Sequence, residues 1–180
     1  MSKALIVVDM QRGFLHPSGA LFRGELVREI IDPIRELVLN ENRGAIGIEP
    51  TAVFFTQDTH APGDKEFDLL PPHCIRGSGE EDIIDELQDV MLGASIIRKR
   101  RNSAFFETDL AAQLSAANPD EIVVVGNCTD ITVLHTVAGL RNRDYRVVVP
   151  ADCVASYDLQ QHEWGLSHIE NILGAKITNR

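Results

Sequence analysis

Short, uninterrupted runs of apolar residues recur along the chain and predict the strands of a sheet. They occupy positions 4–8, 52–55, 122–125 and 147–149, with a similar group at Ala94, Ile96 and Ile97, and a further short strand is predicted at 176–178. These runs do not alternate between apolar and polar residues. Both faces of each strand are therefore expected to be buried, as in a parallel sheet covered by helices.

Apolar residues spaced three or four positions apart predict helices between these strands. One pattern runs from Leu26 to Val38, and Pro33 is expected to kink or restart that helix. Others lie at 83–91, from about Thr108, from Thr129 or Asp130, and over 160–173 before Gly174. This alternation predicts an α/β fold with three layers, α/β/α, around a mostly parallel, Rossmann-like sheet of about six strands.

Length and charge narrow the class of protein. The 180 residues suffice for one domain, which we place at 1–180. With 17 basic and 27 acidic residues the net charge is −10, which disfavours nucleic acid or an anionic membrane as the partner. A small-molecule ligand is expected instead.

Cysteine usage and hydropathy indicate the compartment. Cys74, Cys128 and Cys153 are widely spaced and cannot all pair within one chain. No signal-peptide core precedes Asp9, and no apolar run approaches the ~18 to 20 residues that cross a bilayer. We expect a protein of the reducing cytoplasm.

Several polar residues stand where the predicted strands end, which is where open parallel sheets bind their ligands. Asp9 ends the first strand, and partial desolvation there would raise its pKa towards that of a useful base. The alternative is an aspartate that caps the following turn. Lys99 ends the third strand, although it lies within 98–101, a basic run typical of a solvated surface.

The stretch 57–79 is long, irregular and rich in proline and glycine. It contains Asp58, His60 and His73, a carboxylate and two imidazoles that together suit a divalent metal. Further candidate ligands in the loop are Asp64, Glu66 and Asp68. Their irregular spacing leaves ordinary loop polarity as the alternative. The other histidines are expected to be structural or at the surface: His16, His135, His162 and His168.

Residues 126–132 predict a turn from the fourth strand into a helix. Thr132 falls in the first helical turn, where free backbone N–H groups and the helix dipole favour a developing oxyanion. A nucleophile would suit this position. The alternatives are an ordinary helix-start hydroxyl for Thr132 and a small buried apolar group for Cys128.

Four segments together resemble the isochorismatase-like hydrolase superfamily, the cysteine hydrolases, and its nicotinamidase branch in particular. They are 4–11 with Phe14; Asp58-x-His60 with 71–74 and Gly77; Lys99 with 103–105; and 125–126 with Thr129-Asp130, continued by Val133, Thr136, Tyr145 and Asp152. The resemblance covers almost the whole chain in the same order. It is more specific than any one motif.

The resemblance implies roles for the residues at the strand ends. Asp9 would be the general base and Lys99 the cation that supports it. The implied metal ligands, for Zn, Mn or Fe, are Asp58, His60 and His73, with Glu66 as the candidate fourth ligand.

The resemblance also implies a substrate pocket and an assembly. Phe14, Leu70 and Ile131 would line the pocket. Backbone N–H groups of Cys128 and Thr132 would form the oxyanion hole, after a cis peptide before Cys128. No nucleotide cofactor is implied, and relatives are commonly homo-oligomers, either dimers or tetramers.

One position departs from the family pattern. The family's nucleophilic cysteine stands two residues after the Thr-Asp pair, and here that position is Thr132. A thiol has a pKa of ~8.5 that its neighbours can lower, whereas an alcohol needs a base at the moment of attack. Thr132 is also β-branched, which restricts its rotamers.

Three functions follow as hypotheses. The first is a metal-assisted amidase for a small (hetero)aromatic amide such as nicotinamide, with Thr132 or water at the metal as the attacking group. The second is an isochorismatase-type vinyl-ether hydrolase, which needs Asp9 and Lys99 but not the metal loop. The third is a ligand-binding relative, or an inactivated variant, that lacks the nucleophile.

Overall fold

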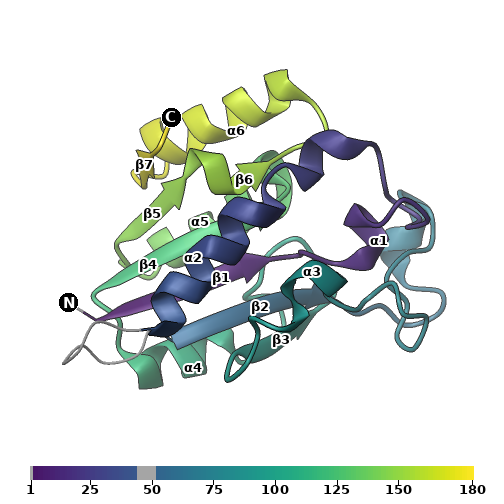
Figure 1. The fold of residues 1–180 in the computed structure, drawn as a ribbon, viewed down its shortest axis with the longest axis horizontal. Helices are drawn as coiled ribbons and strands as arrows, with labels where there is room; N and C mark the ends of the chain where they lie inside the picture. Colours follow the sequence, from purple (N-terminus) through teal and green to yellow (C-terminus); the bar gives the residue numbers. More distant parts are fainter. Residues whose placement is uncertain (1, 44–51) are drawn as a thin grey trace.

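A parallel seven-stranded sheet forms the centre of the molecule in the computed structural model, which describes residues 2–43 and 52–180 (Figure 1). The strands are β1 (Lys3–Val8), β2 (Ala52–Asp58), β3 (Ser95–Lys99), β4 (Glu121–Asn127), β5 (Val147–Pro150), β6 (Val154–Ala155) and β7 (Lys176–Thr178). Their order is β3-β2-β1-β4-β5-β7, and β6 pairs with the end of β4. The predicted α/β class with a mostly parallel sheet is confirmed.

The central strand β1 shows why the apolar runs lack alternation. Val7 pairs with Phe55 of β2 on one side and with Val125 of β4 on the other. From Ala4 to Val8 every residue is fully buried. Helices therefore cover both faces of this strand, as expected for a parallel sheet.

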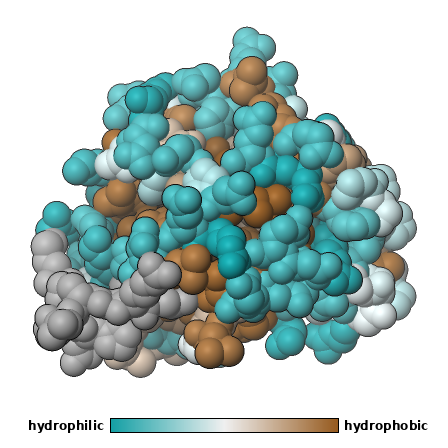
Figure 2. Space-filling model, viewed as in Figure 1, coloured by the Kyte–Doolittle hydropathy of each residue, from teal (hydrophilic) through white to brown (hydrophobic). Residues whose placement is uncertain are grey.

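The helices form the two outer layers. They are α1 (Arg12–Leu15), α2 (Ile31–Arg43), α3 (Asp85–Gln88), α4 (Leu110–Ala117), α5 (Leu134–Arg141) and α6 (Leu159–Asn171). One core cluster joins the α2 and α3 side chains, including Ile34 and Leu87, to Leu5 and Val7 of β1. The other joins α4, α5 and α6 to the opposite face of the sheet. The surface over α2 and α3 is largely hydrophilic, with small hydrophobic areas between polar side chains (Figure 2).

Two helical predictions need correction. The pattern from Leu26 is not one kinked helix, because a separate 3-10 turn (Glu25–Arg28) precedes α2. Pro33 lies in the first turn of α2, where its missing N–H group has no intrahelical partner to lose. The helix expected at 83–91 is only the single turn α3.

The remaining boundaries agree more closely, with one strand unforeseen. Helix α4 begins after the N-cap Asp109, one residue beyond the expected Thr108. Helix α5 is preceded by a π-helical turn, Thr129–Val133, at the position where the sequence places the helix start. The two-residue strand β6 was not predicted, since a pairing so short leaves no hydropathy pattern. No helix in the described part of the chain is long and apolar enough to cross a membrane.

Candidate active site

The ends of three neighbouring strands bring Asp9, Asp58 and Lys99 together. The Lys99 Nζ atom lies 2.8 Å from Asp9 Oδ2 and 2.6 Å from Asp58 Oδ1. All three side chains are buried. The basic run 98–101 is therefore not wholly a solvated surface, because its Lys99 is an internal cation shared by two carboxylates.

Burial and charge set the protonation of this cluster. Burial raises the pKa of Asp9 to about 6, although the neighbouring Lys99 cation opposes the shift. Burial alone would lower the pKa of Lys99, but the Asp58 and Asp9 carboxylates raise it above its ordinary value. Lys99 is consequently a fixed cation at neutral pH, whereas Asp9 can exchange a proton near neutrality.

Neighbouring polar side chains hold the two carboxylates in place. Thr56 Oγ1 donates to Asp9 Oδ1 at 2.5 Å, and Asn127 Nδ2 donates to the Asp9 carbonyl at 2.8 Å. The Asp9 backbone is left-handed, with φ of 51°. Gln11 accepts from Asp58 N at 2.8 Å and donates to Asp58 O at 2.9 Å. These contacts lock the ends of β1, β2 and β4 to one another.

The irregular loop after β2 builds a possible metal site. Ligand atoms of Asp58, His60 and His73 all lie within 4.8 Å of one another. His73 Nδ1 is 2.8 Å from the Pro71 carbonyl oxygen, and His60 Nδ1 is 3.3 Å from an Asp64 carboxylate oxygen. The carbonyl partner at His73 Nδ1 favours the tautomer in which His73 Nε2 carries the lone pair.

His60 supplies the test of whether these residues fit a metal. Its side chain is fully buried, and its Nε2 atom has no hydrogen-bond partner among the described residues. A buried polar atom without a partner is costly unless something binds it. The donor set of one carboxylate and two imidazoles suits zinc and other divalent transition metals.

The other acidic residues of the loop take different positions. Glu66 Oε1 is 3.9 Å from His73 Nε2, and its other oxygen is 3.5 Å from Arg101. Asp64 contacts both His60 and Arg101, the latter at 2.8 Å. Asp68 is exposed and contributes no ligand atom to the three-residue cluster. Glu66 as a fourth ligand remains a prediction.

The turn after β4 carries Cys128 and Thr132. The expected cis peptide is present between Asn127 and Cys128. Thr132 Oγ1 donates to the Asn127 carbonyl at 2.6 Å, and within residues 2–43 and 52–180 it makes no hydrogen bond to Asp9. Burial, with a smaller contribution from Asp130, raises the pKa of the Cys128 thiol. Cys128 is therefore a poor nucleophile, and the Thr132 hydroxyl is held by the backbone of Asn127.

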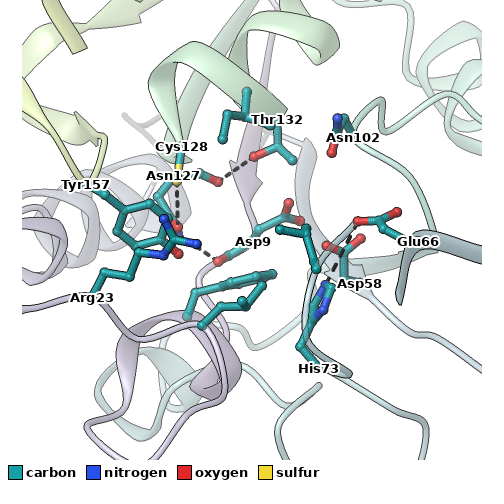
Figure 3. A pocket seen from close by; sticks show the side chains of 14 residues that line it. Asp9, Arg23, Asp58, Glu66, His73, Asn102, Asn127, Cys128, Thr132 and Tyr157 are labelled. Atoms are coloured by element: carbon teal, nitrogen blue, oxygen red, sulfur yellow. Dashed lines mark hydrogen bonds and ion pairs between the residues drawn. The ribbon is translucent and has the colours of Figure 1, made fainter. Parts of the chain in front are cut away.

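A pocket of about 210 Å³ lies between these groups (Figure 3). Its lining residues are Asp9, Phe14, Leu21, Arg23, Asp58, Glu66, Leu70, His73, Asn102, Asn127, Cys128, Ile131, Thr132 and Tyr157. Phe14, Leu70 and Ile131 thus line the pocket where the sequence places them. Lys99 and His60 are buried outside the lining.

Some lining residues escaped the sequence analysis. Arg23 and Leu21 come from the irregular segment between α1 and the 3-10 turn, which carries no periodic pattern. Tyr157 stands two residues after β6, so the strand-end rule would have found it had that strand been recognised. Asn102 follows the basic run and gave no signal of its own.

Comparisons with known proteins agree with this geometry. A family model described as Isochorismatase domain matches residues 3–180. An uncharacterised isochorismatase family protein, PncA of Bacillus subtilis, is 33% identical over 190 aligned positions, covering 98% of this chain and 99% of that protein. The crystal structure of a pyrazinamidase/nicotinamidase from Streptococcus mutans shares 34% identity with a TM-score of 0.90, covering 98% of this chain and 100% of that one. A Pyrococcus horikoshii pyrazinamidase in complex with zinc shares 26% identity with a TM-score of 0.84 over 100% of both chains. The chain belongs to the isochorismatase family.

Proposed function

We propose that this protein is a metal-assisted hydrolase of a small aromatic or heteroaromatic amide such as nicotinamide. One observation carries the proposal: the buried Asp9–Lys99–Asp58 network and the Asp58, His60 and His73 cluster share Asp58 and border one pocket. The similar pyrazinamidase with zinc and the similar nicotinamidase support the amide and the metal.

The pocket walls suit a flat ring. Phe14, Leu70 and Ile131 provide apolar surface, and Asp9 lies beside them among the lining residues. When bound, a divalent metal supplies a Lewis acid at this end of the pocket. Asp58, His60 and His73 are the residues that would hold it.

The chain's own residues would carry the proton transfers. Asp9 takes a proton from the attacking group, either the Thr132 hydroxyl or a water molecule, and gives it to the amide nitrogen, which leaves as ammonia when the C–N bond breaks. If water attacks, the acid forms directly. If Thr132 attacks, the acyl group remains as an ester on its oxygen until a water molecule, deprotonated by Asp9, releases the acid and the proton returns to Thr132. Lys99 remains charged and keeps the Asp9 carboxylate oriented. The backbone N–H groups of Cys128 and Thr132 are our candidates for binding the oxyanion. For Thr132 to attack, its hydroxyl must leave the Asn127 carbonyl.

Ammonia release tests the proposal directly. We expect turnover of nicotinamide or benzamide by the protein supplied with Zn, Mn or Fe. Asp9→Asn, which keeps the size but cannot accept the proton, should lower the rate by about 10² to 10⁴. An active Asp9→Asn variant would contradict the role of Asp9. If Gln11→Ala lost the rate while Asp9→Asn kept it, the contacts that hold the strand ends, and not the Asp9 carboxylate, would account for the activity.

The position of the Thr132 hydroxyl favours a second candidate. Because that hydroxyl donates to Asn127, an activity that needs no nucleophilic side chain also fits the site. Vinyl-ether hydrolysis of the isochorismatase type needs an aspartic acid that protonates the substrate, and Asp9 would be that acid. Release of pyruvate from isochorismate would support this function, and its absence under conditions that bind the substrate would remove it.

We also propose a reducing, cytoplasmic setting and a small molecule as the partner. Cys74, Cys128 and Cys153 are all free thiols and all buried. Assembly into dimers or tetramers stays a prediction.

A further inference from the structure

We infer that the pocket takes an amide that also carries a carboxylate or similar anionic group, and that Arg23 binds this group. The inference rests on the proposed function for the amide alone, since the recognition of the anion depends on other residues. Arg23 would then be a specificity-determining residue at the end of the pocket away from the metal loop.

The charge of the pocket wall is the first observation. Arg23 is the only lysine or arginine among the fourteen lining residues, all of which belong to the described part of the chain. Arg23 also has no acidic partner within residues 2–43 and 52–180. Arg101 and Arg28 pair with acidic side chains, whereas Arg23 makes no ion pair with any described residue. In a chain with 27 acidic and 17 basic residues, an unpaired arginine at a pocket is available to a ligand.

The orientation of Arg23 is the second observation. Its guanidinium carbon lies 5.4 Å from the centre of the Tyr157 ring, another lining residue. Figure 3 shows Arg23 and Tyr157 on the opposite side of Asp9 from His73 and Glu66. Stacking on an aromatic ring restrains a guanidinium group while leaving its N–H edge free, and that edge matches a carboxylate in two parallel hydrogen bonds.

The local backbone lets the chain present Arg23 in this way. Gly24 has φ of 115°, a conformation that side-chain-bearing residues rarely adopt, and it sends the chain from Arg23 into the 3-10 turn. A residue with a Cβ atom would be strained in this backbone conformation, although the space around Gly24 is open. The position of Arg23 therefore follows from the sequence Arg-Gly and from the stacking on Tyr157.

The pocket is electrically uneven along its length. Its acidic residues all have a cation within ion-pair distance, since Asp9 and Asp58 share Lys99 and Glu66 lies 3.5 Å from Arg101. The Arg23 end has no acidic side chain in ion-pair contact among the described residues. A substrate with a neutral end and an anionic end would therefore bind in one orientation, with its anionic end at Arg23.

Matched probes separate charge from shape. Binding of benzamide and of the 2-, 3- and 4-carbamoylbenzoates to the zinc-loaded protein would be measured by calorimetry. At least one carbamoylbenzoate should bind about tenfold or more tightly than benzamide, as expected for a charge-assisted hydrogen bond. Arg23→Gln should bring that affinity down to the benzamide value, and Arg23→Lys should keep part of the difference.

Arg143 offers a matched control. Its guanidinium carbon also lies over an aromatic ring, 4.2 Å from the centre of Phe105, but it does not line the pocket. Arg143→Gln should keep the full preference for the carboxylate. Equal binding of all probes to the wild-type protein would overturn the inference. So would a preference that survives in Arg23→Gln, which would assign the carboxylate to the metal loop.

The outcome does not depend on turnover. A carboxylate preference that Arg23→Gln removes, in a protein that hydrolyses no amide, would support this inference and contradict the proposed function. Hydrolysis of nicotinamide by a protein that binds all probes equally would support the proposed function and contradict this inference.

Discussion

The two walls of the pocket differ in the number of charged and polar side chains that could take part in hydrolysis. The wall formed by the ends of β1, β2 and β3 holds a buried cation between two carboxylates and, beside it, the three clustered side chains that we propose as metal ligands. The wall formed by the turn after β4 has Thr132 at the position where we expect the attacking group, and its hydroxyl donates to the Asn127 carbonyl.

This difference separates two requirements of catalysis. The first wall consists of buried charges that neutralise one another. Removing one of them leaves an unpaired buried charge, which destabilises the fold. The second wall contributes an uncharged side chain with one hydrogen bond, so its substitution should leave the surrounding turn folded. We therefore expect loss of the buried cation in the first wall to cost both stability and activity, and changes in the second wall to alter activity without loss of the fold.

The largest effect is expected for Lys99→Met. This change leaves Asp9 and Asp58 buried without a cation, which should lower the free energy of unfolding by about 3 to 5 kcal/mol and abolish activity. Urea unfolding measures the loss. Lys3→Met is the control, since Lys3 is half-exposed and 4.0 Å from Glu41, and it should cost less than about 1 kcal/mol. Equal losses of unfolding free energy in the two variants would contradict the idea that the first wall depends on its buried cation.

The next largest effect is expected on the affinity for zinc. His73→Ala removes one of three clustered ligands and should weaken zinc affinity by about a hundredfold or more in a competition assay with a chelating dye. Asp64→Asn keeps all three ligands but weakens the partner of His60, so a loss of about ten- to a hundredfold is expected. His135→Ala, which changes an exposed histidine, should leave zinc affinity unchanged. If His73→Ala bound zinc as well as the wild type does, the metal would lie elsewhere.

The smallest effect concerns acid stability. Burial would raise the pKa of Asp64, but hydrogen bonds from the Glu66 backbone, His60 and Arg101 lower it to about 2. A carboxylate with a lowered pKa in the folded state stabilises the fold above its unfolded value, and this contribution is lost as the pH falls towards 2. Between pH 5 and 2 the wild type should lose roughly 1 to 2 kcal/mol more stability than Asp64→Asn, less than the full shift implies because Arg101 is partly exposed. Parallel stability curves for the two proteins would contradict this.

The sequence predicted the first wall better than the second, and the reason is geometric. Parallel strands end at one edge of a sheet, so the sequence alone predicts that Asp9, Asp58 and Lys99 lie together. The direction of the Thr132 hydroxyl depends on one side-chain rotation and on the π-helical turn around it. No sequence pattern encodes that rotation.

The irregular segments were the least predictable part. Arg23 reaches the pocket through a turn at Gly24, and neither a hydropathy period nor a motif marks it. Residues 83–91 have helical spacing but form only one helical turn, because Ile83 and Ile84 enter the core before α3 begins. Tertiary packing outweighs local periodicity in such short segments.

The central claim is that an amide-hydrolysing site is intact here except for its attacking group, and Thr132→Cys tests it most directly. Ammonia release from nicotinamide would be compared for the wild type and Thr132→Cys, both supplied with zinc. We expect Thr132→Cys to be at least about tenfold faster, the change that about 1.4 kcal/mol of barrier produces, because a thiol ionises far more readily than an alcohol.

Alkylation by iodoacetamide confirms that the introduced thiol is in place. The native thiols should react slowly in the folded protein, since burial raises the pKa of Cys74 and Cys128, and that of Cys153 to about 12. Rapid labelling of Thr132→Cys, blocked by nicotinamide, together with faster ammonia release, is the predicted result. A labelled variant that releases no more ammonia than an inactive wild type, from any amide tested, would contradict the account.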